Sequence, residues 1–203
     1  MKEIPVIQIY LWNNLVGAMS WDDEMGYADF QFDDHFSRSG LDIAPLTMPL
    51  ARTRGVISFP TNARTKCFSG LPGLIADALP DKFGSQIITE WFAQQGKTES
   101  MITPLDRLCY IGKRAMGALE FAPAAKVEGV NESTEIYIRE LMEMSDSLFK
   151  ERSKFQELIR QNDKSILDIL KVGTSAGGAK PKAIIAYNEE TGEVRSGQVP
   201  APE

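Results

Sequence analysis

Cysteine and histidine are scarce in this sequence, and their scarcity excludes several kinds of site. The 203 residues include two cysteines, Cys67 and Cys109, and one histidine, His35. Two cysteines cannot build a disulfide framework or a metal site, and so few are typical of a protein from the reducing cytoplasm. His35 stands in a polar run, and we interpret it as a solvated loop residue. We therefore expect no metal site, and no Ser-His-Asp triad of the usual kind.

Positive charge and long apolar runs are also in short supply. The chain has 22 Lys and Arg against 28 Asp and Glu, a net charge of −6. This balance disfavours nonspecific nucleic-acid binding by the whole surface, although a local basic patch or a DNA-binding partner remains compatible with it. No apolar run approaches the roughly 20 residues that span a bilayer. The first residues include Glu3 and lack a cleavage site, so they do not form a signal peptide.

The remaining composition predicts a globular α+β protein that begins with a small antiparallel sheet. Apolar residues make up 43% of the chain, as in ordinary globular proteins. Strands are expected at Val6–Trp12, Leu15–Trp21 and Tyr27–Phe32, with a turn at Asn13-Asn14. The irregular residues 37–69 contain one further short strand, at Val56–Phe59.

Acidic side chains cluster at two places in this opening part. Asp22, Asp23 and Glu24 form one group, and Asp33 and Asp34 form the other. Paired carboxylates can act as catalysts or metal ligands. Both groups lie at expected turns between strands, where Asp is favoured by bonds to its own backbone. We interpret them as solvated turn residues.

Two helical stretches follow. Apolar spacing predicts a helical block over Leu74–Gln95 with one broad apolar face, broken or kinked by Pro80 and closed by Gly96. That face is interpreted as core. A second, shorter helix is expected from Pro104 to about Gly112, because Thr103 is a good N-cap and proline is favoured at the first helical position.

The second half of the chain contains a candidate domain boundary, further helices and the start of a new sheet. A strand is expected at Gly117–Ala122, and the small, polar stretch Ala122–Asn131 is the best candidate for a boundary between domains of residues 1–125 and 126–203. Helices are expected at Thr134–Phe149 and Phe155–Leu170. Strands at Ala183–Tyr187 and 194–199, joined by a hairpin tip at 190–192, would begin a new sheet.

A glycine-rich loop between the last helix and this new sheet is the strongest functional signal. Its small residues allow several backbone N–H groups to point into one anion-binding concavity, and two lysines add positive charge. The candidate phosphate-binding residues are Ser175, Ala176, Gly177, Gly178, Ala179, Lys180 and Lys182. A surface turn is the simpler alternative.

The order of elements around the loop favours one kind of phosphate site over others. A P-loop ends in Lys-Ser or Lys-Thr and lies between a strand and a helix, whereas here a helix precedes and a strand follows. No Gly-x-Gly-x-x-Gly fingerprint is present, which argues against a Rossmann site. A glycine-rich flap that runs into a strand is how protein kinases cover nucleotide phosphates.

Four stretches, taken together and in order, resemble the HipA family of bacterial serine/threonine kinases, the toxins of type II toxin–antitoxin systems. They are Pro45–Leu50, Phe68–Asp81, Leu105–Gly112 with Gly117–Leu119, and Ser175–Lys182. The run Phe68–Asp81, FSGLPGLIADALPD, is the most specific of them.

The resemblance implies a β-rich N-terminal subdomain on a kinase-like fold, a cytoplasmic location, and ATP and Mg²⁺ as cofactors of the whole enzyme. It also implies a HipB-like helix-turn-helix antitoxin as partner, DNA contact only through that antitoxin, and protein substrates that include aminoacyl-tRNA synthetases. The glycine-rich loop would cover ATP, and Ser175 would be the serine that the kinase phosphorylates on itself. The extra Gly177 and Pro181, which stands where an acidic residue is common, depart from the family pattern.

The sequence leaves the function open between three hypotheses. A kinase needs a lysine after the loop, a catalytic aspartate and Mg²⁺ ligands, but Ala183–Tyr187 has no lysine and few residues follow it. We expect no catalytic residue in this chain and place those groups, by resemblance, beyond residue 203. The chain would then be the N-terminal part of a HipA-like kinase, inactive alone. Alternatively it is a regulatory module that docks on a separate kinase core, or an unrelated α+β interaction domain.

Overall fold

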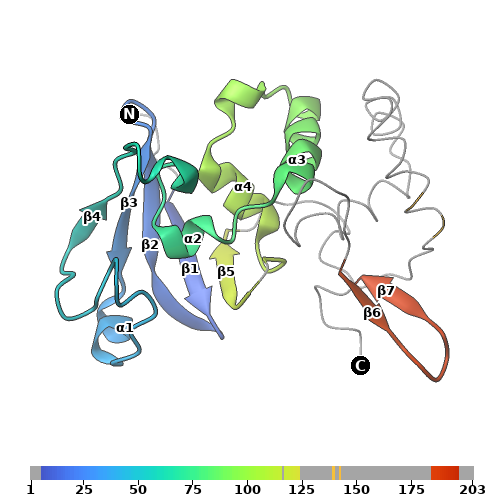
Figure 1. Cartoon of the computed structure of the whole chain (residues 1–203), viewed down its shortest axis with the longest axis horizontal. Coiled ribbons are helices and arrows are strands. Elements are labelled where there is room, and N and C mark those ends of the chain that lie inside the picture. The colour runs from blue at the N-terminus through green and yellow to red at the C-terminus, as the bar shows by residue number, and fades with distance from the viewer. Residues whose placement is uncertain (1–5, 116, 124–138, 140–141, 143–183, 197–203) are drawn as a thin grey trace. The chain divides into compact units, whose positions relative to one another are not determined.

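The computed structural model describes residues 6–115, 117–123, 139, 142 and 184–196 (Figure 1). The chain divides into two compact units. The first comprises Met1–Leu79 and Thr103–Ala125, and the second comprises Pro80–Ile102 and Lys126–Glu203.

A five-stranded antiparallel sheet forms the centre of the first unit. In space its strands follow the order β4-β3-β2-β1-β5. Their bounds are Val6–Leu11 for β1, Asn14–Asp22 for β2, Tyr27–Phe32 for β3, Val56–Ser58 for β4 and Leu119–Ala122 for β5. The expected meander of the first three strands is confirmed, and the short strands near Val56 and Leu119 complete its two edges.

The turn between β1 and β2 lies one residue earlier than predicted. Its central residues are Trp12 and Asn13, with φ of 48° and 63°, whereas Asn14 already belongs to β2. Positive φ at both central positions is the geometry of a type I′ turn, whose twist matches a two-residue hairpin. The Asn14 side chain fixes this register, because its Nδ2 donates to the carbonyl of Trp12 at 2.9 Å.

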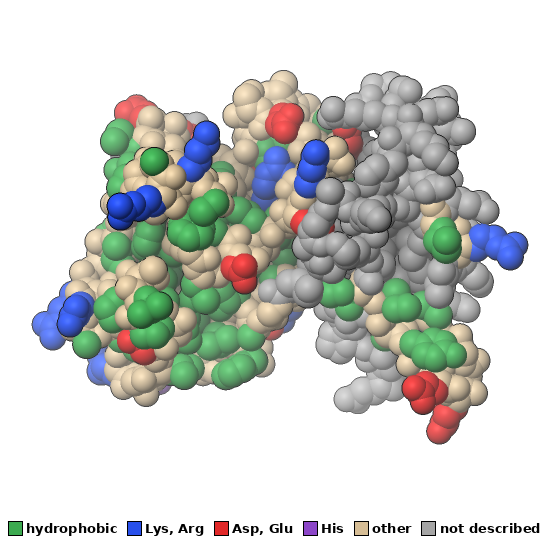
Figure 2. All heavy atoms as spheres, in the orientation of Figure 1, with side chains coloured by type: hydrophobic (Ala, Val, Ile, Leu, Met, Phe, Trp, Pro, Cys, Tyr) green, Lys and Arg blue, Asp and Glu red, His purple; other side chains and the backbone are tan. Residues whose placement is uncertain are grey.

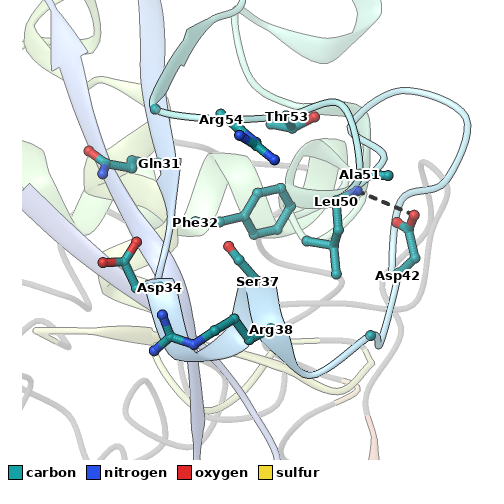
Figure 3. Close-up of a pocket in the computed structure, with 12 residues that line it drawn as sticks. Gln31, Phe32, Asp34, Ser37, Arg38, Asp42, Leu50, Ala51, Thr53 and Arg54 are labelled. Carbon is teal, nitrogen blue, oxygen red and sulfur yellow. Dashed lines mark hydrogen bonds between the residues drawn. The ribbon is translucent and has the colours of Figure 1, made fainter.

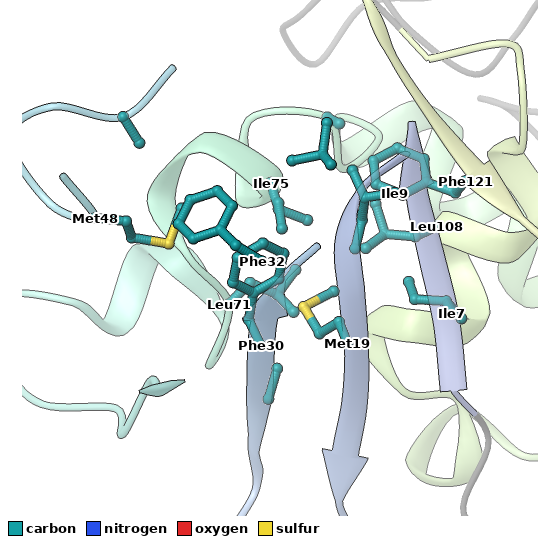
Figure 4. Close-up of a cluster of buried hydrophobic side chains, with 14 of the residues drawn as sticks. Ile7, Ile9, Met19, Phe30, Phe32, Met48, Leu71, Ile75, Leu108 and Phe121 are labelled. Carbon is teal, nitrogen blue, oxygen red and sulfur yellow. The ribbon is translucent and has the colours of Figure 1, made fainter. Parts of the chain in front are cut away.

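One face of the sheet packs against helices and loops to form the core. The helices of this unit are α1 (Asp34–Arg38), the 3₁₀ turn η1 (Lys66–Phe68), α2 (Gly73–Ala76) and α4 (Pro104–Ile111). Alternate strand residues point inward, and buried side chains from α2, α4 and the loops meet them (Figure 4). They include Ile7, Ile9, Met19, Phe30, Met48, Leu71, Ile75, Leu108 and Phe121.

Helix α4 begins and ends as the sequence predicted. Thr103 is its N-cap and Pro104 its first residue. The Thr103 side chain accepts from the backbone N–H of Asp106 at 3.1 Å, and the Asp106 carboxylate accepts in return from the N–H of Thr103 at 2.9 Å. This capping box satisfies donors that a helix start leaves open, and Gly112 is the C-cap.

The predicted helical block Leu74–Gln95 is two helices, α2 and α3 (Lys82–Gln94), as the break at Pro80 implied. The prediction of one broad apolar face is wrong. Leu74 and Leu79 pack against the core of the first unit, whereas α3 belongs to the second unit. Asp81 restarts the helix by accepting from the N–H of Gly84 at 2.8 Å. The C-cap of α3 is Gln95, and Gly96, which was expected to be the cap, follows it with φ of 79°.

The described part of the second unit contains α3, the 3₁₀ turn η2 (Glu99–Met101) and a hairpin of β6 (Ile185–Tyr187) and β7 (Val194–Ser196). The hairpin confirms the predicted strand pair. The helices expected at 134–149 and 155–170 lie outside the described residues, apart from Arg139 and Met142, which have helical backbone. Within the described part of the chain, no helix has the length and apolar character needed to cross a membrane.

Candidate functional site

The predicted phosphate-binding loop is not among the residues that the structure describes. This holds for every candidate in it: Ser175, Ala176, Gly177, Gly178, Ala179, Lys180 and Lys182. The description resumes just before β6, the strand that was expected to follow the loop. The role of the loop therefore stays a prediction.

The first acidic group binds its own backbone at the β2–β3 turn, as predicted, whereas Asp33 and Asp34 are the N-cap and first residue of α1 and do not lie in a turn between strands. Asp22 Oδ1 accepts from the N–H groups of Glu24 and Met25, both at 2.9 Å. Asp33 caps α1 by accepting from the N–H of His35 at 2.8 Å and of Phe36 at 3.1 Å. His35 is exposed, but it lies in α1 and not in a loop. The described residues contain no group of three or more His, Cys, Asp or Glu that could hold a metal ion.

The FSGLPG turn, Phe68–Gly73, has a structural role that sequence reasoning did not assign. Ser69 and Gly70 both have positive φ, 54° and 75°. The Gly70 carbonyl accepts from the N–H of Ala28 at 2.8 Å. A Cβ on Gly70 would lie 2.7 Å from the carbonyl oxygen of Gly26. The turn therefore docks against the β2–β3 hairpin at a separation that only glycine permits.

A buried cation lies directly after α4. Arg114 is only 2% exposed, its guanidinium lies 5.0 Å from the centre of the Tyr110 ring, and it donates to the Tyr110 carbonyl. Burial raises the pKa of Tyr110 to about 12, against the opposing effect of the Arg114 charge. Burial also lowers the pKa of Arg114. The pair lies inside the protein and closes the end of α4, so we assign it to the fold.

A pocket of about 690 Å³ lies where α1 meets the end of β3 and the loop that leads to β4 (Figure 3). Four charged residues line it: Asp34 and Arg38 from α1, and Asp42 and Arg54 from the loop. Phe32 contributes an aromatic wall. From the sequence, Asp34 is interpreted as a solvated turn residue and none of the other three is singled out, because they are scattered through an irregular stretch without a motif.

Hydrogen bonds and charge define this pocket, which we call the α1–β4 pocket. Asp42 Oδ2 accepts from the N–H of Leu50 at 3.3 Å and ties the two sides of the loop together. Within the described residues, neither Arg38 nor Arg54 forms an ion pair shorter than 4.0 Å. In Figure 3 their side chains lie on opposite sides of the Phe32 ring. The pocket thus presents two guanidinium groups that are available for a ligand.

A smaller, mainly apolar hollow of about 300 Å³ lies beside the first hairpin turn, between Trp12, Leu15, Phe36 and Leu41. Trp12 is 69% exposed.

On the face seen in Figure 2, the Lys and Arg side chains of the described residues stand in separate groups and form no continuous basic surface. A broad nucleic-acid footprint is absent from that face of the described chain.

Comparison with known proteins identifies a family, and solved structures share the fold. The family model described as HipA N-terminal domain matches residues 7–122. A chain in the complex of the Shewanella oneidensis MR-1 toxin–antitoxin system HipA, HipB and its operator DNA is 19% identical, with a TM-score of 0.50. The match covers 93% of this chain and 37% of that one, so this chain spans little more than a third of its length. No curated protein sequence matches.

Proposed function

This chain belongs to the HipA family through its N-terminal domain, and we propose that it is the N-terminal part of a HipA-like serine/threonine protein kinase toxin. One observation carries the proposal. The family match over residues 7–122 takes in all five strands of the first unit, from the second residue of β1 to the last residue of β5. The match also includes residues 80–102, which belong to the second unit. The proposed site of action is the cytoplasm.

In the proposed enzyme, the glycine-rich loop of residues 175–182 covers ATP. Lys180 and Lys182 supply positive charge for its phosphates, and Ser175 is the site of autophosphorylation. A phosphate on Ser175 would place negative charge where the phosphates of ATP enter, and so would switch the kinase off. When bound, ATP with magnesium would supply the γ-phosphoryl group for transfer to a protein hydroxyl, with ADP and the hydroxyl proton released.

The short, exposed hairpin that follows the loop supports the proposal that it is part of a larger sheet in the whole enzyme. Strands β6 and β7 have three residues each, and a two-stranded sheet of this size is marginal in water. Ile185 is 40% exposed and Tyr187 60% exposed. Further strands would cover these side chains. The catalytic aspartate and the magnesium ligands would come from the same additional lobe.

The proposed partner is a HipB-like helix-turn-helix antitoxin. The matched Shewanella structure contains HipB and operator DNA together with HipA. A net charge of −6 disfavours direct DNA binding by this chain. DNA contact is therefore assigned to the antitoxin. An aminoacyl-tRNA synthetase is a reasonable substrate to test, on the family resemblance alone.

A second candidate is a regulatory module that docks on a separate HipA-like kinase core. The observation that favours it is the self-contained core of the first unit, in which side chains from five strands and three helices pack together. Such a core can fold without a kinase lobe. In this case the chain would modulate a kinase in trans and would bind no ATP by itself.

Intact mass of the gene product from its native cell separates the two candidates. A mass of at least about twice 22.5 kDa supports the kinase, and a mass of 22.5 kDa supports the regulator. In the kinase case, Ser175→Ala should abolish autophosphorylation measured with radiolabelled ATP. Thr174→Ala, a neighbouring hydroxyl, should leave it unchanged. Full labelling of the Ser175→Ala protein would disprove the role of Ser175.

A further inference from the structure

The α1–β4 pocket carries two positive and two negative side chains that the domain itself does not use against each other. Arg38 and Arg54 are exposed and line the pocket together with Asp34 and Asp42. Ion pairs of either arginine within 4.0 Å are lacking among the described residues. A volume of about 690 Å³ is within the usual range for ligand sites.

We infer that this pocket binds a monoanionic carboxylate that carries an apolar group, held between Arg38 and Arg54. The inference is independent of the kinase function proposed above. It concerns only the first unit, whose residues form the whole pocket. The arginines are 16 positions apart in the sequence and reach the pocket from different elements, α1 and the loop before β4. Figure 3 shows that the two side chains flank the centre of the pocket.

The chemistry of the four charges selects a carboxylate over a phosphate. A guanidinium group presents a planar fork of N–H donors that matches a carboxylate in two parallel hydrogen bonds. Phosphate is attracted to the same groups but carries about 1.5 to 2 negative charges at neutral pH. Asp34 and Asp42 would repel a second negative charge more than a single one. The pocket therefore fits one negative charge best.

The apolar wall accounts for the rest of the ligand. Phe32 is 6% exposed and is held in place by its edge-on contact with Phe30, with ring centres 4.8 Å apart. Leu50 stands beside it, and the bond from its N–H to Asp42 fixes that side of the loop. A branched aliphatic side chain next to the carboxylate would cover both residues and gain hydrophobic burial. A carboxylate of this kind occurs in an N-acylated amino acid and at the carboxyl terminus of a peptide.

Titration of the whole chain, followed by NMR, tests the inference with N-acetyl-leucine and its uncharged analogue N-acetyl-leucinamide. The acid should shift backbone amides of residues 31–38 and 50–55 in a saturable manner, and the amide should bind at least about tenfold more weakly. Arg38→Gln and Arg54→Gln should each weaken binding of the acid about tenfold, the loss expected for one charge-assisted hydrogen bond.

Arg52→Gln is the matched control, because Arg52 is exposed in the same loop and does not line the pocket. It should leave binding unchanged, and thermal melting of all three variants should show that each is folded. Equal affinity for acid and amide, or an equal loss in Arg52→Gln, would overturn the inference. Inorganic phosphate that binds more tightly than N-acetyl-leucine would overturn the assignment to a carboxylate.

A further arm of the same titration identifies the source of the carboxylate. A hexapeptide that ends in leucine is compared with N-acetyl-leucine. Tighter binding of the peptide, with additional shifts along β4, assigns the pocket to a peptide terminus. Equal binding assigns it to a small molecule, and no binding of either carboxylate refutes the site.

Discussion

Gly70 shows at the scale of one residue why the FSGLPG turn tolerates so little change. Its φ is 75°, and an added Cβ would meet the backbone of Gly26 at 2.7 Å and of Tyr27 at 2.9 Å. Both contacts are with backbone atoms, which cannot rotate away. The motif that is most specific for the family is thus also a steric requirement of the first unit.

Gly70→Ala should therefore destabilise the protein by about 2–4 kcal/mol, the sum of left-handed backbone strain and overpacking. Gly40 provides a matched control, because its φ is also 75° and a Cβ there would meet nothing within 4 Å. Gly40→Ala should cost only the backbone part, about 1–2 kcal/mol. Urea denaturation measures both, and equal losses would show that the Gly70 contacts are not limiting.

Tyr110 makes stability depend on alkaline pH. Burial raises its pKa to about 12 in the folded state, whereas an unfolded tyrosine ionises near 10. The folded protein retains a proton that the unfolded chain has released. The contribution of Tyr110 to the free energy of unfolding should thus be fully present below pH 10. It should fall by up to about 3 kcal/mol as the pH rises towards 12. The difference between the denaturation midpoints at pH 9 and pH 11 should be smaller in Tyr110→Phe than in the wild-type protein. The same difference in both proteins would contradict this account.

At the scale of elements, the helices and strands that were predicted correctly are those whose defining residues are neighbours in the chain. Helix α4 was placed correctly because its N-cap, its proline and its C-terminal glycine are neighbours in the chain. The alternation of apolar and polar residues in β3 likewise corresponds to its alternating buried and less buried side chains. In contrast, the apolar spacing of Leu74–Gln95 could not show that its two halves belong to different units. Helical periodicity specifies a face but not the partner on which that face packs.

The α1–β4 pocket could not be predicted from the sequence for the same reason, because its residues are not neighbours in the chain. Arg38 and Arg54 carry no recognisable spacing, and they come together only because α1 and the loop before β4 fold over the end of β3. The glycine-rich loop is the opposite case. Its chemistry can be inferred from a contiguous run of residues 175–182, but its geometry depends on what surrounds it.

At the scale of the whole molecule, the central sheet and the β6–β7 hairpin differ in how well their backbone hydrogen bonds are protected. The central strands β1, β2 and β3 each pair on both sides and cover a buried core. In contrast, β6 and β7 form a two-stranded sheet with Ile185 and Tyr187 exposed. Exchange of backbone amides with deuterium follows local opening, which is easiest where few apolar contacts resist it.

Hydrogen exchange should therefore be slow in β1–β3 and fast in the β6–β7 hairpin of this chain. If the chain is the N-terminal part of a kinase, further strands and bound nucleotide should protect the hairpin in the full-length protein. Protection should rise about tenfold or more at Ile185–Tyr187 and stay unchanged in β2, which serves as the internal control. Mass spectrometry of peptides from both proteins measures the difference. Equal exchange of the hairpin in the two proteins would mean that no larger sheet forms on it, and the regulatory module would become the better account.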